Sequence, residues 1–178
     1  NSANPLDIRG LLDEHKGLPF GVIERGETLV DIGSWCAMPN HFHILVKEKQ
    51  ENGITKFMLK LTTAYSMYFN KNYNRNGRLF QGPFQSSHIG EDTYLKYLFA
   101  YIHLNPIKLI EPKWKETGIR NKISAQKYLS NYRYSSYLDY IGINRDFSYI
   151  LNKQAFPRYF LNKYDFANFT NKWLAYKG

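Results

Sequence analysis

Two runs of strand-forming residues, separated by a short break, constrain the fold of this chain most. Residues 27–38 are rich in β-branched, aromatic and other residues that favour strands. Pro39-Asn40 interrupts this run in the way that a turn does, and residues 41–47 form a second run. The pattern predicts a β-hairpin, in which Gly33 indicates a bulge or a close packing contact.

The second run begins with His41-Phe42-His43. Side chains alternate between the two faces of a strand, so the two histidines should share one face while Phe42 points to the other. Two imidazoles at this spacing can share one divalent metal ion. The pair alone is a weak signal, because such a pattern also occurs without a metal.

Helices are predicted on both sides of the hairpin. A short helix is expected over residues 5–16, and a longer amphipathic one over residues 54–69, where apolar residues recur at helical spacing. A third helix is expected over residues 93–104. Asp92 would be its N-cap, and Pro106 would end or kink it.

The remaining pattern completes a mixed architecture. Residues 79–89 alternate in hydrophobicity and are predicted to form a strand. Because strands and helices follow one another, an α+β fold is expected. We place a core at residues 1–110 and a basic, tyrosine-rich extension, packed on that core, at residues 111–178.

The charge distribution favours a polyanionic partner. The chain has 178 residues and a formal net charge of +9. Residues 41–108 carry nine Lys or Arg against four Asp or Glu, and residues 111–178 carry twelve against five, whereas residues 1–40 are acidic. Positive charge interleaved with tyrosines is typical of proteins that bind nucleic acid. A basic surface without such a partner is the alternative.

Composition excludes several classes of protein. Aromatic residues make up 17% of the chain, far more than a disordered chain would contain. No apolar run approaches the roughly 20 residues that a membrane span needs, so no membrane association is expected. Cys36 is the one cysteine, which excludes an intramolecular disulfide framework. No signal peptide is recognised, and a cytoplasmic protein is expected.

A second candidate for chemistry lies at the end of the third helix. Tyr101 and Asn105 are four residues apart and would share a helix face. A tyrosine hydroxyl, with a pKa near 10, is a poor nucleophile at neutral pH, but a metal-bound phosphate makes its attack feasible. Asn105 offers an amide oxygen as a third metal ligand. The alternative is an apolar stripe that ends in a capping asparagine.

Three sequence blocks then carry a resemblance to a known family. They are Cys-Ala-Met-Pro-Asn-His-Phe-His-Ile-Leu-Val at residues 36–46, Gly-Arg-Leu-Phe-Gln-Gly at residues 77–82, and Tyr-Ile-His-Leu-Asn-Pro at residues 101–106. In these blocks the chain resembles the IS200/IS605-like transposases, the single-tyrosine members of the HUH endonucleases, which include the REP-associated tyrosine transposases. The resemblance covers residues 26–110, and more faintly residues 132–137.

The resemblance implies roles for named residues. His41, His43 and Asn105 would ligate Mg²⁺ or Mn²⁺, and Tyr101 would be the nucleophile. The reaction would cleave single-stranded DNA, leave a 5′-phosphotyrosine and a free 3′-OH, and rejoin by the reverse attack without a nucleotide cofactor. The fold would be a ferredoxin-like antiparallel sheet sandwiched with helices, followed by a mostly helical C-terminal extension.

DNA contacts are expected from residues around these blocks, although a lone basic side chain is more often simply solvated. The candidates are Arg75, Arg78, Gln81, Lys108 and Arg133. The resemblance also implies single-stranded or hairpin DNA as the partner, and a prokaryotic cell with the protein at the nucleoid. Relatives include homodimers and monomers, and the sequence leaves both open.

The sequence departs from the family in three places. The aromatic strand followed by Arg-Gly, with which relatives usually begin, is not found before Pro5. Three explanations stay open: the chain is a fragment, it lacks ordered residues there, or it has lost the edge strand. The Gly-Thr-Trp-His motif of many REP-associated members is absent, and Gln85 stands where relatives often have a basic residue. A relative that binds DNA hairpins without cutting is therefore an alternative. An RNA-binding module is a third possibility, but it lacks an RNP-type aromatic motif.

Overall fold

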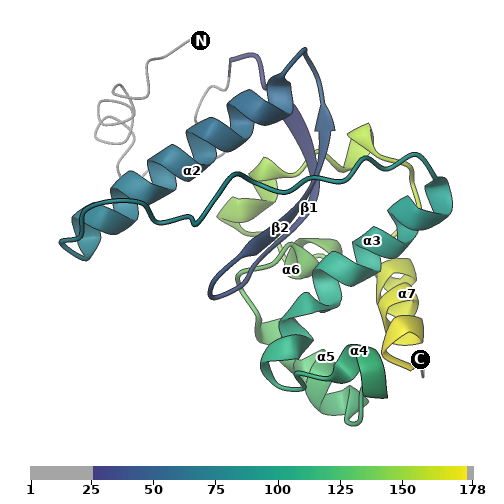
Figure 1. Cartoon of the computed structure of the whole chain (residues 1–178). Helices are drawn as coiled ribbons and strands as arrows, with labels where there is room; N and C mark the ends of the chain where they lie inside the picture. The colour runs from purple at the N-terminus through teal and green to yellow at the C-terminus, as the bar shows by residue number, and fades with distance from the viewer. Residues whose placement is uncertain (1–25, 176–178) are drawn as a thin grey trace. The chain divides into compact units, whose positions relative to one another are not determined.

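The computed structural model describes residues 26–175 (Figure 1). The helix predicted over residues 5–16 lies outside this range. Within it, the α+β class is confirmed, because the chain forms one two-stranded antiparallel sheet and a larger number of helices. None of the helices in the described part is long and apolar enough to cross a membrane.

The predicted hairpin is present. Strand β1 spans Val30–Ala37 and strand β2 spans Phe42–Glu48, and the two pair with each other. The backbone N–H of Met38 donates to the carbonyl oxygen of His41 at 2.8 Å, which closes the Pro-Asn turn between the strands. His41 is therefore the last residue of the turn, and His43 is the second residue of β2.

The second edge of β1 contacts segments from the C-terminal region. Cys36 forms an antiparallel bridge with Ser135, and Ile32 forms a parallel bridge with Leu151. Each contact is a single bridge, because a helix begins two residues after Ser135, and Leu151 lies between a 3₁₀ helix that ends at Ile150 and another that begins at Lys153. In residues 26–175 the sheet thus has two strands, and the larger ferredoxin-like sheet stays an expectation from the resemblance.

Gly33 in β1 makes the close packing contact that the sequence indicated. A Cβ added there would lie 2.9 Å from the ring of Phe156, closer than side chains tolerate. Glycine therefore lets the C-terminal region approach the strand directly.

The two long helices are also confirmed. Helix α2 spans Gly53–Asn72 and helix α3 spans Asp92–Leu104. The N-cap of α3 is Glu91, so the prediction of Asp92 as the cap is wrong by one residue. After α3 the chain tightens into a 3₁₀ helix, Asn105–Leu109, since proline at its second position cannot donate the bond that would continue the α-helix.

The strand predicted over residues 79–89 is wrong. This segment is irregular, and most of its residues are exposed. Pro83 lacks the N–H that a sheet ladder needs, and a Cβ at Gly82 would meet nothing within 4 Å. Alternating hydrophobicity alone does not hold a strand that has no pairing partner in the described part of the chain.

The C-terminal region is mostly helical, as expected. Short helical segments alternate with turns until a final longer helix. The elements are α4 (Trp114–Thr117), α5 (Lys122–Asn131), α6 (Tyr137–Tyr140), two 3₁₀ helices (Asp146–Ile150 and Lys153–Ala155) and α7 (Lys163–Ala175).

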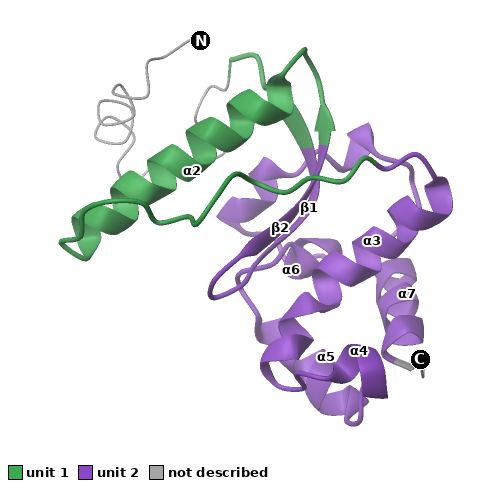
Figure 2. Ribbon diagram, viewed as in Figure 1, with its two compact units in different colours: residues 1–31, 47–88 green, residues 32–46, 89–178 purple. Residues whose placement is uncertain are grey.

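Contacts divide the chain into two compact units (Figure 2). Unit 1 comprises residues 1–31 and 47–88, and its described part contains α2. Unit 2 comprises residues 32–46 and 89–178. The histidine segment, the tyrosine helix and the C-terminal extension therefore belong to one unit, and the division predicted at residue 110 stays a prediction.

Unit 2 has a continuous apolar core. The hairpin, α3, α6 and α7 all contribute to it, and the buried side chains include Cys36, Leu45, Phe99, Ile102, Leu104, Tyr137, Tyr140, Phe156, Phe166 and Leu174. Because α3 buries one face in this core, its opposite face is held at the surface in a fixed orientation.

His103 of α3 is fully buried and belongs to a chain of hydrogen bonds. Its Nδ1 donates to the carbonyl oxygen of Phe99 at 2.7 Å, so its Nε2 accepts from the hydroxyl of Ser136, also at 2.7 Å. Ser136 Oγ accepts the backbone N–H of Trp35 in β1 at 2.9 Å. Burial lowers the pKa of His103 to about 3, so the ring is neutral. This series of hydrogen bonds links α3 to strand β1 of the hairpin.

Replacing Ser136 with alanine is expected to destabilise this link. The change leaves the buried Nε2 of His103 without a donor, which should lower the free energy of unfolding by about 2 kcal/mol. Urea unfolding followed by circular dichroism measures the loss. Ser124→Ala, an exposed serine in α5, should stay within about 0.5 kcal/mol. Equal stability of the two variants would contradict the role assigned to Ser136.

Candidate functional site

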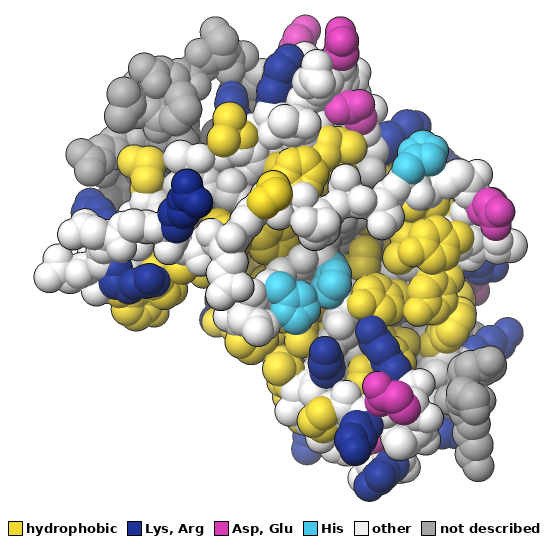
Figure 3. Space-filling view, in the orientation of Figure 1, with side chains coloured by type: hydrophobic (Ala, Val, Ile, Leu, Met, Phe, Trp, Pro, Cys, Tyr) yellow, Lys and Arg dark blue, Asp and Glu magenta, His cyan; other side chains and the backbone are white. Residues whose placement is uncertain are grey.

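The hairpin brings its two histidines together on one face, as predicted. The ring centroids of His41 and His43 are 5.0 Å apart, and the ring planes are almost perpendicular at 88°. Figure 3 shows two adjacent histidines at the surface, with hydrophobic side chains on one side and lysine or arginine side chains nearby. Metal–nitrogen bonds are about 2 Å long, so rings at this separation can approach one ion.

The neighbour of His41 orients its ring. Nδ1 of His41 lies 2.7 Å from Oδ1 of Asn40. An amide oxygen only accepts hydrogen bonds, so Nδ1 carries a proton, and Nε2 is the nitrogen that has the lone pair in the neutral ring. Partners of this kind fix the tautomer of metal-binding histidines. Asn40 is part of the block that carried the family resemblance. It both forms the turn between the strands and orients the ring of His41.

His43 is neutral at physiological pH. Burial is the main cause that lowers its pKa to about 4, and the positive charges of Lys115 and Lys108 and the neighbouring His41 act in the same direction. A neutral imidazole is the form that binds a metal. The surrounding lysines suit a site whose other occupant is an anion.

Helix α3 presents Tyr101 to this pair. The ring centroid of Tyr101 lies 5.4 Å from that of His43, and the planes meet at 79°. Tyr101 is partly exposed, whereas its neighbours on both sides of the sequence are buried. The hydroxyl thus lies at the surface beside the histidines, on a helix fixed by the core.

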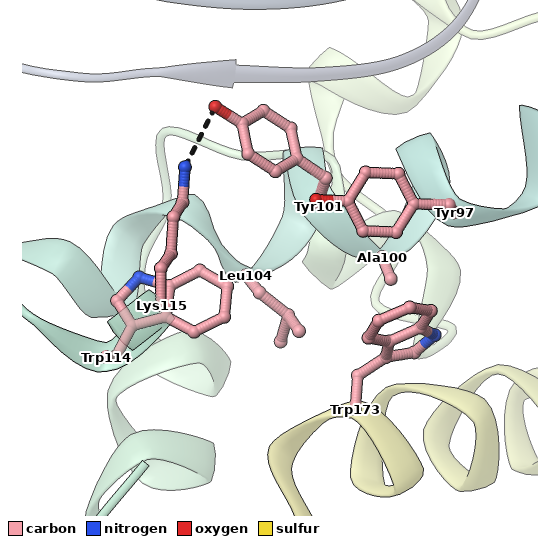
Figure 4. A pocket seen from close by; sticks show the side chains of 7 residues that line it. All are labelled: Tyr97, Ala100, Tyr101, Leu104, Trp114, Lys115 and Trp173. Carbon is pink, nitrogen blue, oxygen red and sulfur yellow. Dashed lines mark hydrogen bonds between the residues drawn. The ribbon is translucent and has the colours of Figure 1, made fainter. Parts of the chain in front are cut away.

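Lys115 of α4 reaches the same hydroxyl. Its Nζ donates to the Tyr101 hydroxyl at 3.1 Å, and Nζ lies 4.2 Å from the centre of the Tyr101 ring (Figure 4). An ammonium group at this distance stabilises negative charge on the phenol oxygen.

The pKa of Tyr101 lies below its usual value. Burial alone would raise it, but hydrogen bonding by Lys115 and Asn105 and the positive charges of Lys115 and Lys108 outweigh that cause. Tyr101 therefore forms the phenolate, which is the nucleophilic form, at a lower pH than an isolated tyrosine does.

Asn105 is the candidate for a third metal ligand. In residues 26–175, no three His, Cys, Asp or Glu side chains come together in a way that could hold a metal ion. Within that range, an amide side chain is the kind of third ligand that the sequence predicted. Asn105 follows α3 directly and is 2% exposed. Its Nδ2 donates to the carbonyl oxygen of Tyr101 at 3.3 Å, and that hydrogen bond does not use the amide oxygen. The role of this oxygen as a metal ligand stays a prediction.

The predicted DNA contacts fall into two groups. Lys108 is exposed, and its charge acts on both His43 and Tyr101, while its DNA-contacting role stays a prediction. Arg133 is exposed in unit 2, where its guanidinium lies 5.7 Å from the Tyr134 ring centre.

The other three candidates lie in unit 1 and are exposed. They are Arg75, Arg78 and Gln81, and a DNA-contacting role for them stays a prediction.

Lys115 is the residue that sequence reasoning missed. It lies fourteen positions after the tyrosine, beyond the proline that ends the helix. Its neighbours Lys113 and Trp114 give no local signal that distinguishes it. A contact of this kind is created by the return of the chain after a turn, so it needs the tertiary structure.

Comparison with models of protein families gives a match over the first part of the described chain. Residues 24–105 match the family model described as "Transposase IS200 like". This range contains both histidines, the tyrosine and the asparagine, and it ends before Lys108 and Lys115. No curated protein matches the chain, and no solved structure does.

Proposed function

We propose, since residues 24–105 match the family model of the IS200-like transposases, that this chain cuts and rejoins one strand of DNA with Tyr101 as the nucleophile. The observation that carries the proposal is the position of that phenol. Its ring lies 5.4 Å from the His43 ring, and its hydroxyl accepts a hydrogen bond from Lys115 at 3.1 Å. A surface tyrosine with only a structural role needs neither neighbour.

The first step forms a covalent link to DNA. The Tyr101 hydroxyl loses its proton to water, while the Lys115 ammonium stabilises the charge left on the oxygen. The phenolate oxygen attacks the scissile phosphorus, a new P–O bond forms, and the bond from phosphorus to the 3′ oxygen breaks. The departing oxygen takes a proton from water. Phosphate is thereby left on Tyr101 and a 3′-OH on the other strand end.

The second step reverses the first. A 3′-OH attacks the phosphotyrosine, the DNA backbone is rejoined, and the phenol of Tyr101 is released. One phosphodiester is exchanged for another, so neither ATP nor another energy source is needed. Lys115 again stabilises the phenolate, which is now the leaving group.

IS200-like transposases in general depend on a divalent metal, and the donor set here fits one. His41, His43 and Asn105 would hold the ion, which would neutralise charge on the scissile phosphate when it is bound. His43 is neutral, which is the form that ligates, and the contact of His41 Nδ1 with Asn40 directs any metal bond of that ring to Nε2.

A covalent adduct tests the proposed function. The protein is incubated with Mg²⁺ or Mn²⁺ and with single-stranded oligonucleotides that carry an end of the transposable element. The mixture is then run on a denaturing gel. A slower band that carries both protein and DNA is expected, and duplex DNA of the same sequence should give much less of it. Salt-dependent binding without any adduct would instead favour a relative that binds hairpins and does not cut.

Adduct formation should require less Mn²⁺ than Mg²⁺. Imidazole nitrogens bind Mn²⁺ better than Mg²⁺, which prefers oxygen ligands and keeps its waters. Mn²⁺ is therefore expected to support adduct formation at a concentration about tenfold lower than Mg²⁺, and excess chelator should stop it. A metal titration of adduct yield measures the difference. Full activity in chelator would contradict the metal role of the histidines.

A further inference from the structure

Three tyrosines of α3 form a row that leads to the reacting hydroxyl. Tyr94, Tyr97 and Tyr101 follow one another at spacings of three and four residues, so they share a helix face. The rings of Tyr94 and Tyr97 are 6.0 Å apart and close to parallel at 20°, and those of Tyr97 and Tyr101 are also 6.0 Å apart. Tyr94 is 43% exposed and Tyr97 is 36% exposed. The row is therefore partly open to solvent.

A pocket of about 190 Å³ adjoins the row. Tyr97 and Tyr101 line it on α3, and Trp114 of α4 and Trp173 of α7 line it from the other helices (Figure 4). The ring of Trp173 lies 5.2 Å from that of Tyr97. Sites for small molecules usually measure about 300–1,000 Å³. This pocket is smaller and aromatic, and so suits one planar ring rather than a whole nucleotide.

The charges around the row differ between its two ends. Lys115 and Lys108 act on Tyr101 at one end. At the other end, the helix begins with the acidic Glu91 and Asp92 next to Tyr94. A phosphate is therefore held best beside Tyr101, and the rest of the row offers rings rather than charge. This complementarity fits a strand whose phosphate sits at the reacting end and whose bases lie over the rings.

We propose that Tyr94, Tyr97 and the adjoining pocket form a stacking track for the bases next to the scissile phosphate of single-stranded DNA. The proposal rests on the proposed function, because it places the strand relative to Tyr101. Aromatic side chains bind single strands in a sequence-tolerant way, because every base has a flat face to stack. The track orients the strand.

Binding of a labelled oligothymidylate of about 16 nucleotides tests the track. The measurement uses fluorescence anisotropy and the full chain with Tyr101→Phe, so that no cleavage interferes. Tyr94→Ala and Tyr97→Ala should each weaken binding about tenfold, while Tyr97→Phe should bind within twofold or so of the parent. Tyr164→Ala is the control, because Tyr164 is an exposed tyrosine outside the row, near the start of α7 and nine residues before Trp173.

An oligonucleotide of the same length without bases completes the experiment. It should bind the parent and both alanine variants with the same affinity, since only stacking is lost. The proposal is overturned if the alanine variants bind the oligothymidylate like the parent, if Tyr97→Phe loses as much as Tyr97→Ala, or if the baseless probe shows the same loss. The assay needs no cleavage, so the track can hold when no adduct forms, and an adduct can form when the track fails.

Discussion

Tyr101→Phe is expected to abolish the covalent protein–DNA adduct. The substitution removes one oxygen and keeps the ring that packs beside His43, so folding and DNA binding should be unchanged. Loss of a nucleophile typically costs about 10⁴-fold or more in rate, which takes the adduct below detection. Denaturing gels with labelled single-stranded DNA measure the yield, and Tyr164→Phe, at an exposed position of α7, should retain full activity.

The outcome that would contradict this prediction is an adduct that survives in Tyr101→Phe. Tyr97 would then be the first alternative, because its ring lies 6.0 Å from that of Tyr101. That result would also contradict the role of Lys115 in stabilising the phenolate, since its ammonium contacts the hydroxyl of Tyr101.

Lys115→Met is expected to slow adduct formation about 10- to 100-fold near pH 7.5, the cost of losing a hydrogen bond to a charged group. The change should also shift the pH dependence. Lys115 lowers the pKa of Tyr101, so the methionine variant has a higher phenol pKa and needs a higher pH to form the phenolate. Its rate of adduct formation should therefore rise more steeply with pH than that of the parent. The difference between the two rates should be smaller at about pH 9.5 than at pH 7.5.

Two matched variants isolate the effect of Lys115. Lys115→Arg keeps the charge and should recover most of the rate. Lys113→Met removes an exposed lysine two residues away, at the N-cap of α4, and should leave the rate and its pH profile unchanged. A constant loss at every pH in Lys115→Met would show that the lysine acts through DNA binding alone.

The parts of the site that sequence reasoning recovered are those fixed by local rules. Strand alternation was enough to put His41 and His43 on one face, because the side-chain period of a strand is two. Helical spacing was enough to put Tyr101 and Asn105 one turn apart. The convergence of these two elements needed the family resemblance, since no local pattern says that β2 and α3 lie side by side.

The parts that sequence reasoning missed depend on contacts between distant segments. Lys115 contacts Tyr101 only because α4 turns back toward α3 after the 3₁₀ helix. The hydroxyl of Ser136, 33 residues after His103, completes that histidine's hydrogen bonds. Conversely, residues 79–89 have the alternation of a strand but no pairing partner in the described part of the chain, so tertiary context overrides the local pattern.

The central claim is that Tyr101 becomes covalently bound to DNA, and mass spectrometry of the adduct tests it most directly. The adduct is digested with protease and nuclease, and the peptide that carries a nucleotide is sequenced by fragmentation. We predict a phosphodiester link between Tyr101 and the 5′ end of the cleaved strand, with an unmodified 3′-OH on the released strand. A nucleotide on any other residue, or a phosphate left on the released 3′ end, would contradict the mechanism.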